Sequence, residues 1–159
     1  MNAKRNYGAM LRACIVASSL LFAGTTAVHA QEDMEQAVEV RQSLLKLVRW
    51  NLGPLGNMAR GRIPLDIEQV GTNAARIEGL FGMMADAFAA DTRGADVETD
   101  ALDRIWEESA AFAEKISAAR QAAADLAAIA GVGDEDEVVA GIGALARTCG
   151  SCHDDYKAD

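Results

Sequence analysis

The chain has 159 residues, 50% hydrophobic and 25% charged with only two prolines, which suits one helix-rich globular domain and leaves little room for a second. Aromatic residues make up only 5% of the chain, and few segments alternate β-branched with polar residues, so an all-β sandwich or barrel is excluded. The formal net charge of −9 makes nucleic acid and anionic membrane surfaces poor partners.

The first thirty residues have the pattern of a secretory signal peptide. A basic head without acidic residues precedes an apolar stretch at about residues 13–23, and small residues then lead to a predicted cleavage site between Ala30 and Gln31. The apolar stretch is shorter than the ~20 residues that a membrane-spanning helix needs. We therefore expect residues 1–30 to be removed on export, which leaves residues 31–159 in the periplasm without attachment to a membrane.

Cleavage would change both the charge and the inventory of reactive residues. Residues 1–30 hold three basic residues and no acidic ones, so 12 basic and 24 acidic residues remain and the net charge becomes −12. Such a charge would suit a basic redox partner. The cysteines and the histidine that remain are Cys149, Cys152 and His153, all within five consecutive residues.

Four amphipathic stretches follow the cleavage site, and turn signals separate them. The predicted helices cover residues 33–52, 66–88, 99–131 and 134–156. Capping pairs, in which an Asp is followed three residues later by Gln or Glu, mark the starts at Asp33, Asp66 and Asp134. The first helix is expected to stop or kink at Gly53 and Pro54. Four helices joined by loops predict an all-α fold, an antiparallel up-down four-helix bundle.

The last predicted helix carries a heptad-like apolar seam. Its positions are spaced 4, 3, 4, 3 and 4 residues apart, at Val138, Ile142, Leu145, Cys149, Cys152 and Tyr156. Three glycines weaken the helix prediction, because each costs up to about 1 kcal/mol relative to alanine; they are Gly141, Gly143 and Gly150.

The segment from Cys149 to His153 reads C-x-x-C-H, the pattern of covalent haem attachment. On a helix, residues three apart point to the same side, so Cys149 and Cys152 would reach the two vinyl groups of one porphyrin edge. His153 follows directly and would act as an axial ligand to the iron. The pattern therefore predicts one covalently attached haem c.

Three other roles are possible for this segment. A structural disulfide would suit an oxidising compartment. A thioredoxin-type redox pair would be expected near a β-α-β pattern, which the chain lacks. A zinc site would need four nitrogen or sulfur ligands, and the mature chain offers three. The adjacent histidine, the signal peptide and the apolar seam favour haem c.

Only six residues follow His153, and none is Met or His. A second axial ligand would therefore have to come from an upstream methionine, and the candidates are Met34, Met58, Met83 and Met84. Such ligation would give a six-coordinate, low-spin electron-transfer cytochrome.

Three segments make the chain similar to cytochrome c′, a class II cytochrome c: CGSCHDDYK near the end, VEVRQSLLKLV in the first helix and IWEESAAFAEK in the third. The resemblance covers about residues 31–159. In that family an Arg-Gln pair on the first helix is followed, four residues after the Arg, by the residue that faces the open side of the haem. These positions are Arg41, Gln42 and Leu45 here. Because low-spin relatives place a ligating Met in this region, the resemblance implies a five-coordinate, high-spin iron under Leu45.

The chemistry of leucine leads to the same expectation. Leu45 cannot coordinate iron, and its isobutyl group offers bound water no hydrogen-bond partner. Small uncharged gases, NO above all and then CO, would still enter, whereas bound oxygen would lack a stabilising donor. The alternative is that Leu45 is an ordinary core leucine.

Two basic residues complete the expected haem environment. Arg41 lies one turn from Leu45, and we expect its guanidinium to pair with a haem propionate; the alternative is an arginine that reaches into solvent. Lys157 lies four residues after His153, where the resemblance implies a basic residue beside the proximal face. Alternatively, Lys157 complements the C-terminal helix dipole.

Two functions compete at the sixth iron position. A gas-binding protein needs a vacancy there, whereas a one-electron shuttle benefits from fixed Met–His ligation, and Leu45 favours the gas binder. No positioned acid–base pair accompanies the motif, so we do not expect an enzyme. The resemblance also implies a homodimer through the first two helices, and Trp50 is a candidate to face the partner subunit.

Overall fold

A computed structural model describes the backbone of residues 7–158 and the side chains of residues 31–158. The described backbone forms five helices: α1 (Tyr7–Ala59), α2 (Ile67–Ala87), α3 (Arg104–Glu107), α4 (Ser109–Val132) and α5 (Glu135–Tyr156). Outside the helices, one isolated antiparallel bridge joins Ala101 to Lys157.

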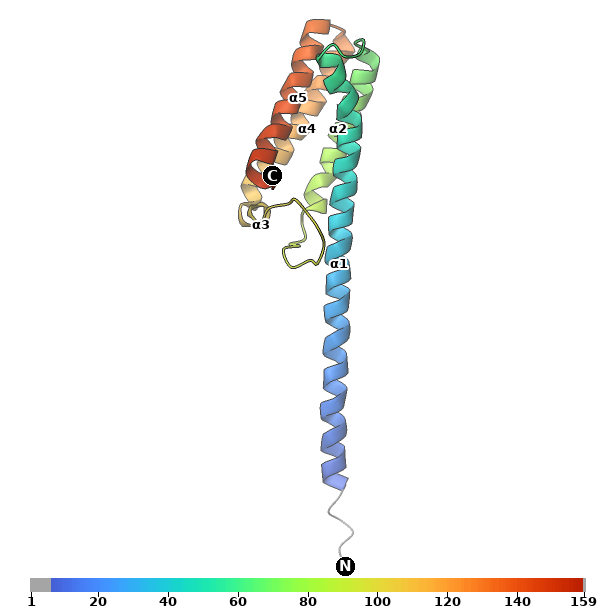
Figure 1. Ribbon diagram of the computed structural model, residues 1–159, viewed down its shortest axis with the longest axis vertical. Coiled ribbons are helices and arrows are strands. Elements are labelled where there is room, and N and C mark those ends of the chain that lie inside the picture. The colour runs from blue at the N-terminus through green and yellow to red at the C-terminus, as the bar shows by residue number, and fades with distance from the viewer. Residues whose placement is uncertain (1–6, 159) are drawn as a thin grey trace, which may run out of the picture.

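The four long helices form an antiparallel up-down bundle (Figure 1). Helix α1 packs against α2 and α5, and α4 packs against the same two helices, so that α1 and α4 lie diagonally across the bundle. The short α3 lies at the end of the bundle where α5 terminates (Figure 1). This arrangement confirms the predicted fold class.

Helix α1 is longer than predicted at both ends. The sequence predicts a start at Asp33 and a stop or a kink at Gly53 and Pro54, but the helix runs from Tyr7 to Ala59 with Pro54 inside it, so it does not stop there. No proline precedes residue 54 to interrupt the helix. Beyond Pro54 the helix is maintained by packing, because Leu55 and Met58 are buried in the core.

The lower part of α1 extends beyond the bundle (Figure 1). Within the predicted signal peptide, residues 1–6 lie outside the described backbone and residues 7–30 outside the described side chains. Cleavage after Ala30 therefore remains a prediction. Among the described residues, no helix combines the length and the apolar character needed to cross a membrane.

The third predicted helix starts later than expected and is interrupted. Helix α3 begins at Arg104, and Glu108 separates it from α4. The backbone before it pairs with the end of the chain: Ala158 N donates to Asp100 O at 2.8 Å, and Leu102 N donates to Tyr156 O at 3.1 Å. Pairing with the C-terminal segment thus replaces the first predicted helical turn.

The capping signals are confirmed where a helix starts at them. The carboxylate of Asp66 accepts a hydrogen bond from Gln69 N at 2.9 Å, and that of Asp134 accepts one from Glu137 N at 2.9 Å. Gly133 ends α4 in the left-handed region, with φ of 89°. Asp33, by contrast, lies inside α1 and starts no helix.

The core runs along the bundle axis, and each long helix contributes to it. Completely or almost completely buried examples are Leu55, Ile77, Leu126 and Leu145. The predicted seam of α5 is buried at Val138, Ile142, Leu145 and Tyr156, whereas the two cysteines are half-buried. Gly141 allows α5 to approach α4 closely, since a Cβ there would lie 3.0 Å from Leu126 Cδ1.

Candidate haem site

The C-x-x-C-H segment lies in the last two turns of α5. Cys149 and Cys152 form no disulfide with each other, both are half-buried, and Cys152 packs against the core cluster. Burial raises the pKa of both thiols, whereas a thioredoxin-type redox pair relies on a lowered thiol pKa. His153 is exposed. Within the part of the chain whose side chains are described, no three His, Cys, Asp or Glu residues gather in a metal-binding group.

Arg41 is the most unusual charged residue of the bundle, because only 2% of it is exposed. One guanidinium nitrogen, Nη2, donates a hydrogen bond to Thr92 Oγ1. The guanidinium carbon lies 5.0 Å from the ring centroid of Phe88 and 5.3 Å from that of Trp106. The side chain therefore does not reach into solvent, which was the alternative considered from sequence.

The second nitrogen of this guanidinium, Nη1, is buried and makes no hydrogen bond among the described atoms. Burial lowers the pKa of Arg41, but a guanidinium still keeps its charge. A buried cation with a free donor is costly unless an anion satisfies it. A haem propionate would supply such an anion, so the free donor of Arg41 fits the cofactor that the sequence predicts.

The loop between α2 and α3 covers Arg41. Besides the bond to Thr92, Gln42 Nε2 donates to Glu98 O at 3.0 Å, and Trp106 Nε1 donates to Ala90 O at 3.0 Å. These bonds attach the loop to α1 and α3. The role of Thr92 could not be predicted from the sequence, because a threonine in a polar loop carries no signal that it will meet a residue 51 positions earlier.

Leu45 and its neighbour Leu44 have different surroundings. Leu44 is 9% exposed and belongs to the core cluster, whereas Leu45 is 42% exposed. Leu45 is therefore not the ordinary core leucine considered as an alternative.

A family model described as Cytochrome C′ matches residues 36–157. The chain belongs to the cytochrome c′ family. Proteins of this family carry covalently bound haem c, and the chain's cofactor is accordingly haem c.

Individual relatives agree with this assignment. The chain is 34% identical over 129 residues to cytochrome c′ of Halomonas halodenitrificans, a match that covers 79% of this chain and 98% of the relative. It is also 34% identical over 126 residues to cytochrome c-554 of Cereibacter sphaeroides, covering 78% of this chain and 94% of the relative.

Solved structures of cytochrome c′ share the fold. That of Shewanella frigidimarina superposes with a TM-score of 0.74 at 31% identity, over 79% of this chain and 97% of the other. A nitric oxide complex of a cytochrome c′ variant from Alcaligenes xylosoxidans has a TM-score of 0.70 at 30% identity, over 79% of this chain and 97% of the other.

The upstream methionines differ in their surroundings. Met58 and Met84 are buried in the core cluster, whereas Met83 is 49% exposed on α2. Met34 is half-buried on α1, 11 residues before Leu45, which corresponds to ~16 Å along a helix. None of the four is therefore on the turn of α1 that carries Arg41 and Leu45.

Lys157 caps the C-terminus of α5, just outside the helix. Its backbone N donates to His153 O at 3.1 Å. Its ammonium lies 3.3 Å from Asp100 Oδ2 and donates to Ala158 O at 2.7 Å. The side chain thus participates in the pairing between the C-terminal segment and the segment before α3.

Proposed function

We propose that this member of the cytochrome c′ family binds NO and CO at a five-coordinate haem iron. Cys149 and Cys152 would hold the haem covalently, and His153 would ligate its iron. Leu45 would keep the remaining iron position free of a protein ligand. The observation that carries the proposal is Leu45, a hydrocarbon side chain that cannot ligate iron, at the position that the resemblance to cytochrome c′ gives to the open side of the haem.

Each residue has a defined part in this proposal. Bound haem c supplies an iron centre that accepts a diatomic gas and exchanges one electron. Leu45 excludes water by offering it no hydrogen bond. Arg41 holds a propionate through its free donor Nη1, and Gln42 helps to fix this turn of α1 to the loop above it. Lys157 provides positive charge near the proximal side. A solved neighbour in complex with nitric oxide supports this choice of ligand.

A low-spin electron shuttle is the second candidate. The mature net charge of −12 would suit a basic redox partner, and one relative is named cytochrome c-554. Met58 and Met84, however, are committed to core packing. No catalytic step is part of either candidate function.

Absorption spectra of the mature holoprotein test the choice. We expect broad high-spin bands in the ferric and ferrous states, and shifts when CO or NO is added to the ferrous protein. Sharp low-spin ferrous bands that do not respond to CO would show that a methionine ligates the iron, and the electron-shuttle function would replace gas binding.

Export to the periplasm belongs to the same proposal, because covalent haem attachment and an N-terminal signal pattern occur together in this chain. We expect the purified mature protein to begin at Gln31. Mass spectrometry of the N-terminal peptide measures this directly, and a protein that retains residues 1–30 would contradict export by cleavage.

We further propose that two copies associate through α1 and α2. Exposed apolar side chains on these helices support this arrangement: Val40, Leu47, Trp50 and Met83 are between 46% and 69% exposed. On α1 the first three are spaced seven and three residues apart, so they share one face.

A further inference from the structure

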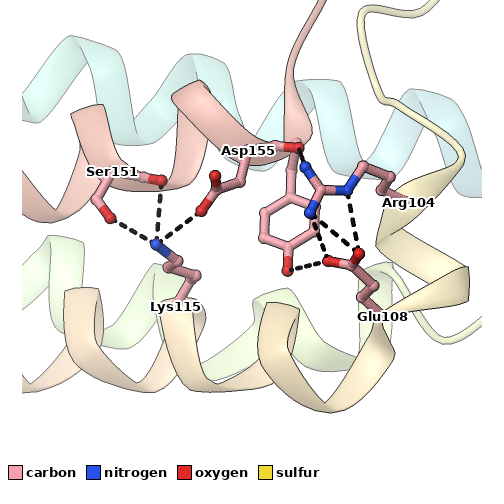
Figure 2. A network of polar contacts seen from close by, with 6 residues as sticks. Arg104, Glu108, Lys115, Ser151 and Asp155 are labelled. Carbon is pink, nitrogen blue, oxygen red and sulfur yellow. Dashed lines mark hydrogen bonds and ion pairs between the residues drawn. The ribbon is translucent and has the colours of Figure 1, made fainter.

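A polar network connects α3 and α4 to the end of α5, where the haem-attachment segment lies (Figure 2). Its centre is Lys115 on α4. The ammonium of Lys115 donates to Ser151 Oγ at 2.6 Å and to Ser151 O at 3.3 Å, and it lies 2.9 Å from Asp155 Oδ2. Ser151 and Asp155 stand immediately before and shortly after the pair formed by Cys152 and His153.

Each N–H group of the Lys115 ammonium has an acceptor. An ammonium has three hydrogens, and Lys115 has three acceptors, all from one turn of α5. The Lys115 side chain is 29% exposed and that of Asp155 is 42% exposed. No other described ion pair joins α4 to α5.

A second cation holds the same turn from the other side (Figure 2). Arg104 Nη1 donates to Asp155 O at 3.4 Å, one of the last carbonyls of α5, which lack helical partners. Glu108 fixes Arg104 through bonds of 2.9 to 3.2 Å and also accepts from Tyr156 Oη at 3.4 Å. The final turn of a helix normally frays, and these contacts oppose fraying at both ends of the segment.

We propose that Lys115 is a positioning residue for the haem-binding turn. By fixing Ser151 and Asp155 to α4, it holds Cys152 and His153, which lie between them, in one orientation toward the haem. This inference rests on the assignment of His153 as the axial ligand in the proposed function. It adds a residue of another helix, 36 positions away from Ser151, to the set that determines the proximal side.

The test compares holoprotein variants on one helix. Lys115→Met keeps the length of the side chain and removes the charge and the donors. Arg120→Met is the matched control, because Arg120 also lies on α4 and forms an inter-helix ion pair of 2.9 Å, with Glu78 on α2. Lys115→Arg restores a charged donor. Hydrogen–deuterium exchange of residues 151–156 reports the turn, and the iron–histidine stretching band of the ferrous protein reports His153.

We expect Lys115→Met to exchange about fivefold faster at residues 151–156 and to broaden the iron–histidine band, because His153 then samples several positions. Lys115→Arg should restore part of both properties, and Arg120→Met should change neither. Wild-type exchange and an unchanged band in Lys115→Met would overturn the proposal. Equal effects in Arg120→Met would overturn it too, since the cause would then be general destabilisation.

The two proposals fail in distinguishable ways. If the wild-type ferrous protein shows no iron–histidine band because its iron is six-coordinate, the gas-binding function is wrong. The exchange measurement at residues 151–156 still decides whether Lys115 holds the turn.

Discussion

At the scale of single residues, the burial of a side chain decides between roles that the sequence alone cannot tell apart. Leu44 and Leu45 are adjacent and chemically identical, yet one is 9% exposed in the core and the other is 42% exposed. Adjacent residues on a helix point about 100° apart, so only one of the pair can face the bundle axis.

This difference gives a paired prediction. Leu45→Ala should speed CO binding to the ferrous protein by roughly tenfold, because it removes the hydrocarbon group over the open site, which corresponds to ~1.4 kcal/mol of barrier. Leu44→Ala should leave CO binding unchanged and lower the free energy of unfolding by about 2–4 kcal/mol through a core cavity. Stopped-flow kinetics and urea unfolding measure the two effects. Equal CO rates in both variants would refute the role of Leu45.

Arg41 gives a second prediction at this scale. Its buried positive charge favours the ferrous state over the ferric state, which carries one more positive charge. Arg41→Met should therefore lower the reduction potential, by roughly 30–60 mV, where 59 mV is a tenfold change for one electron. Spectroelectrochemical titration measures the shift. Arg41→Lys keeps the charge and should stay near the wild-type potential; an unchanged potential in Arg41→Met would contradict the pairing with a propionate.

At the scale of the element, α5 is a continuous helix of 22 residues although its sequence contains three glycines. Its glycines are not equivalent. A Cβ at position 141 would lie 3.0 Å from the buried Leu126 Cδ1, whereas one at position 143 would meet only the side chain of Arg147, at 3.5 Å. The first glycine permits close helix packing, and the second only lowers helix propensity.

Alanine substitutions should separate these effects. Gly143→Ala should raise the free energy of unfolding by about 0.5–1 kcal/mol, because alanine loses less backbone entropy in a helix. Gly141→Ala should lower it by about 1–3 kcal/mol, because the added methyl group overpacks the contact with α4. Chemical denaturation of the two holoproteins measures both values. If both substitutions raised the free energy of unfolding, α4 and α5 could move apart without losing packing energy, and the overpacking predicted for Gly141→Ala would be wrong.

At the scale of the whole molecule, the exposed apolar face of α1 leads us to expect that two copies of the chain associate. Trp50→Glu should convert the proposed dimer to a monomer, since it places a charge on the apolar face that Trp50 shares with Val40 and Leu47. Sedimentation velocity measures the change. Val132→Glu is the control, because Val132 is 79% exposed at the end of α4 and should leave the dimer intact. A wild-type protein that is monomeric at high concentration would contradict the proposal.

Short-range features could be predicted from the sequence alone. The C-x-x-C-H segment, the caps at Asp66 and Asp134 and the helix end at Gly133 each depend on residues within one or two turns. The bundle itself followed from four amphipathic stretches. These features are local, so the chemistry of neighbouring residues is enough to determine them.

The tertiary structure decided what depends on distant partners. Helix α1 continues past Pro54 because Leu55 and Met58 are packed in the core, and α3 begins late because its preceding backbone pairs with the C-terminal segment. Arg41 meets Thr92 across 51 residues, and Lys115 meets Ser151 across 36. Sequence alone determined the family, the cofactor motif and the four amphipathic stretches; only packing determined where the helices begin and end, which charges are buried and what they hold, because burial is a property of the assembled bundle.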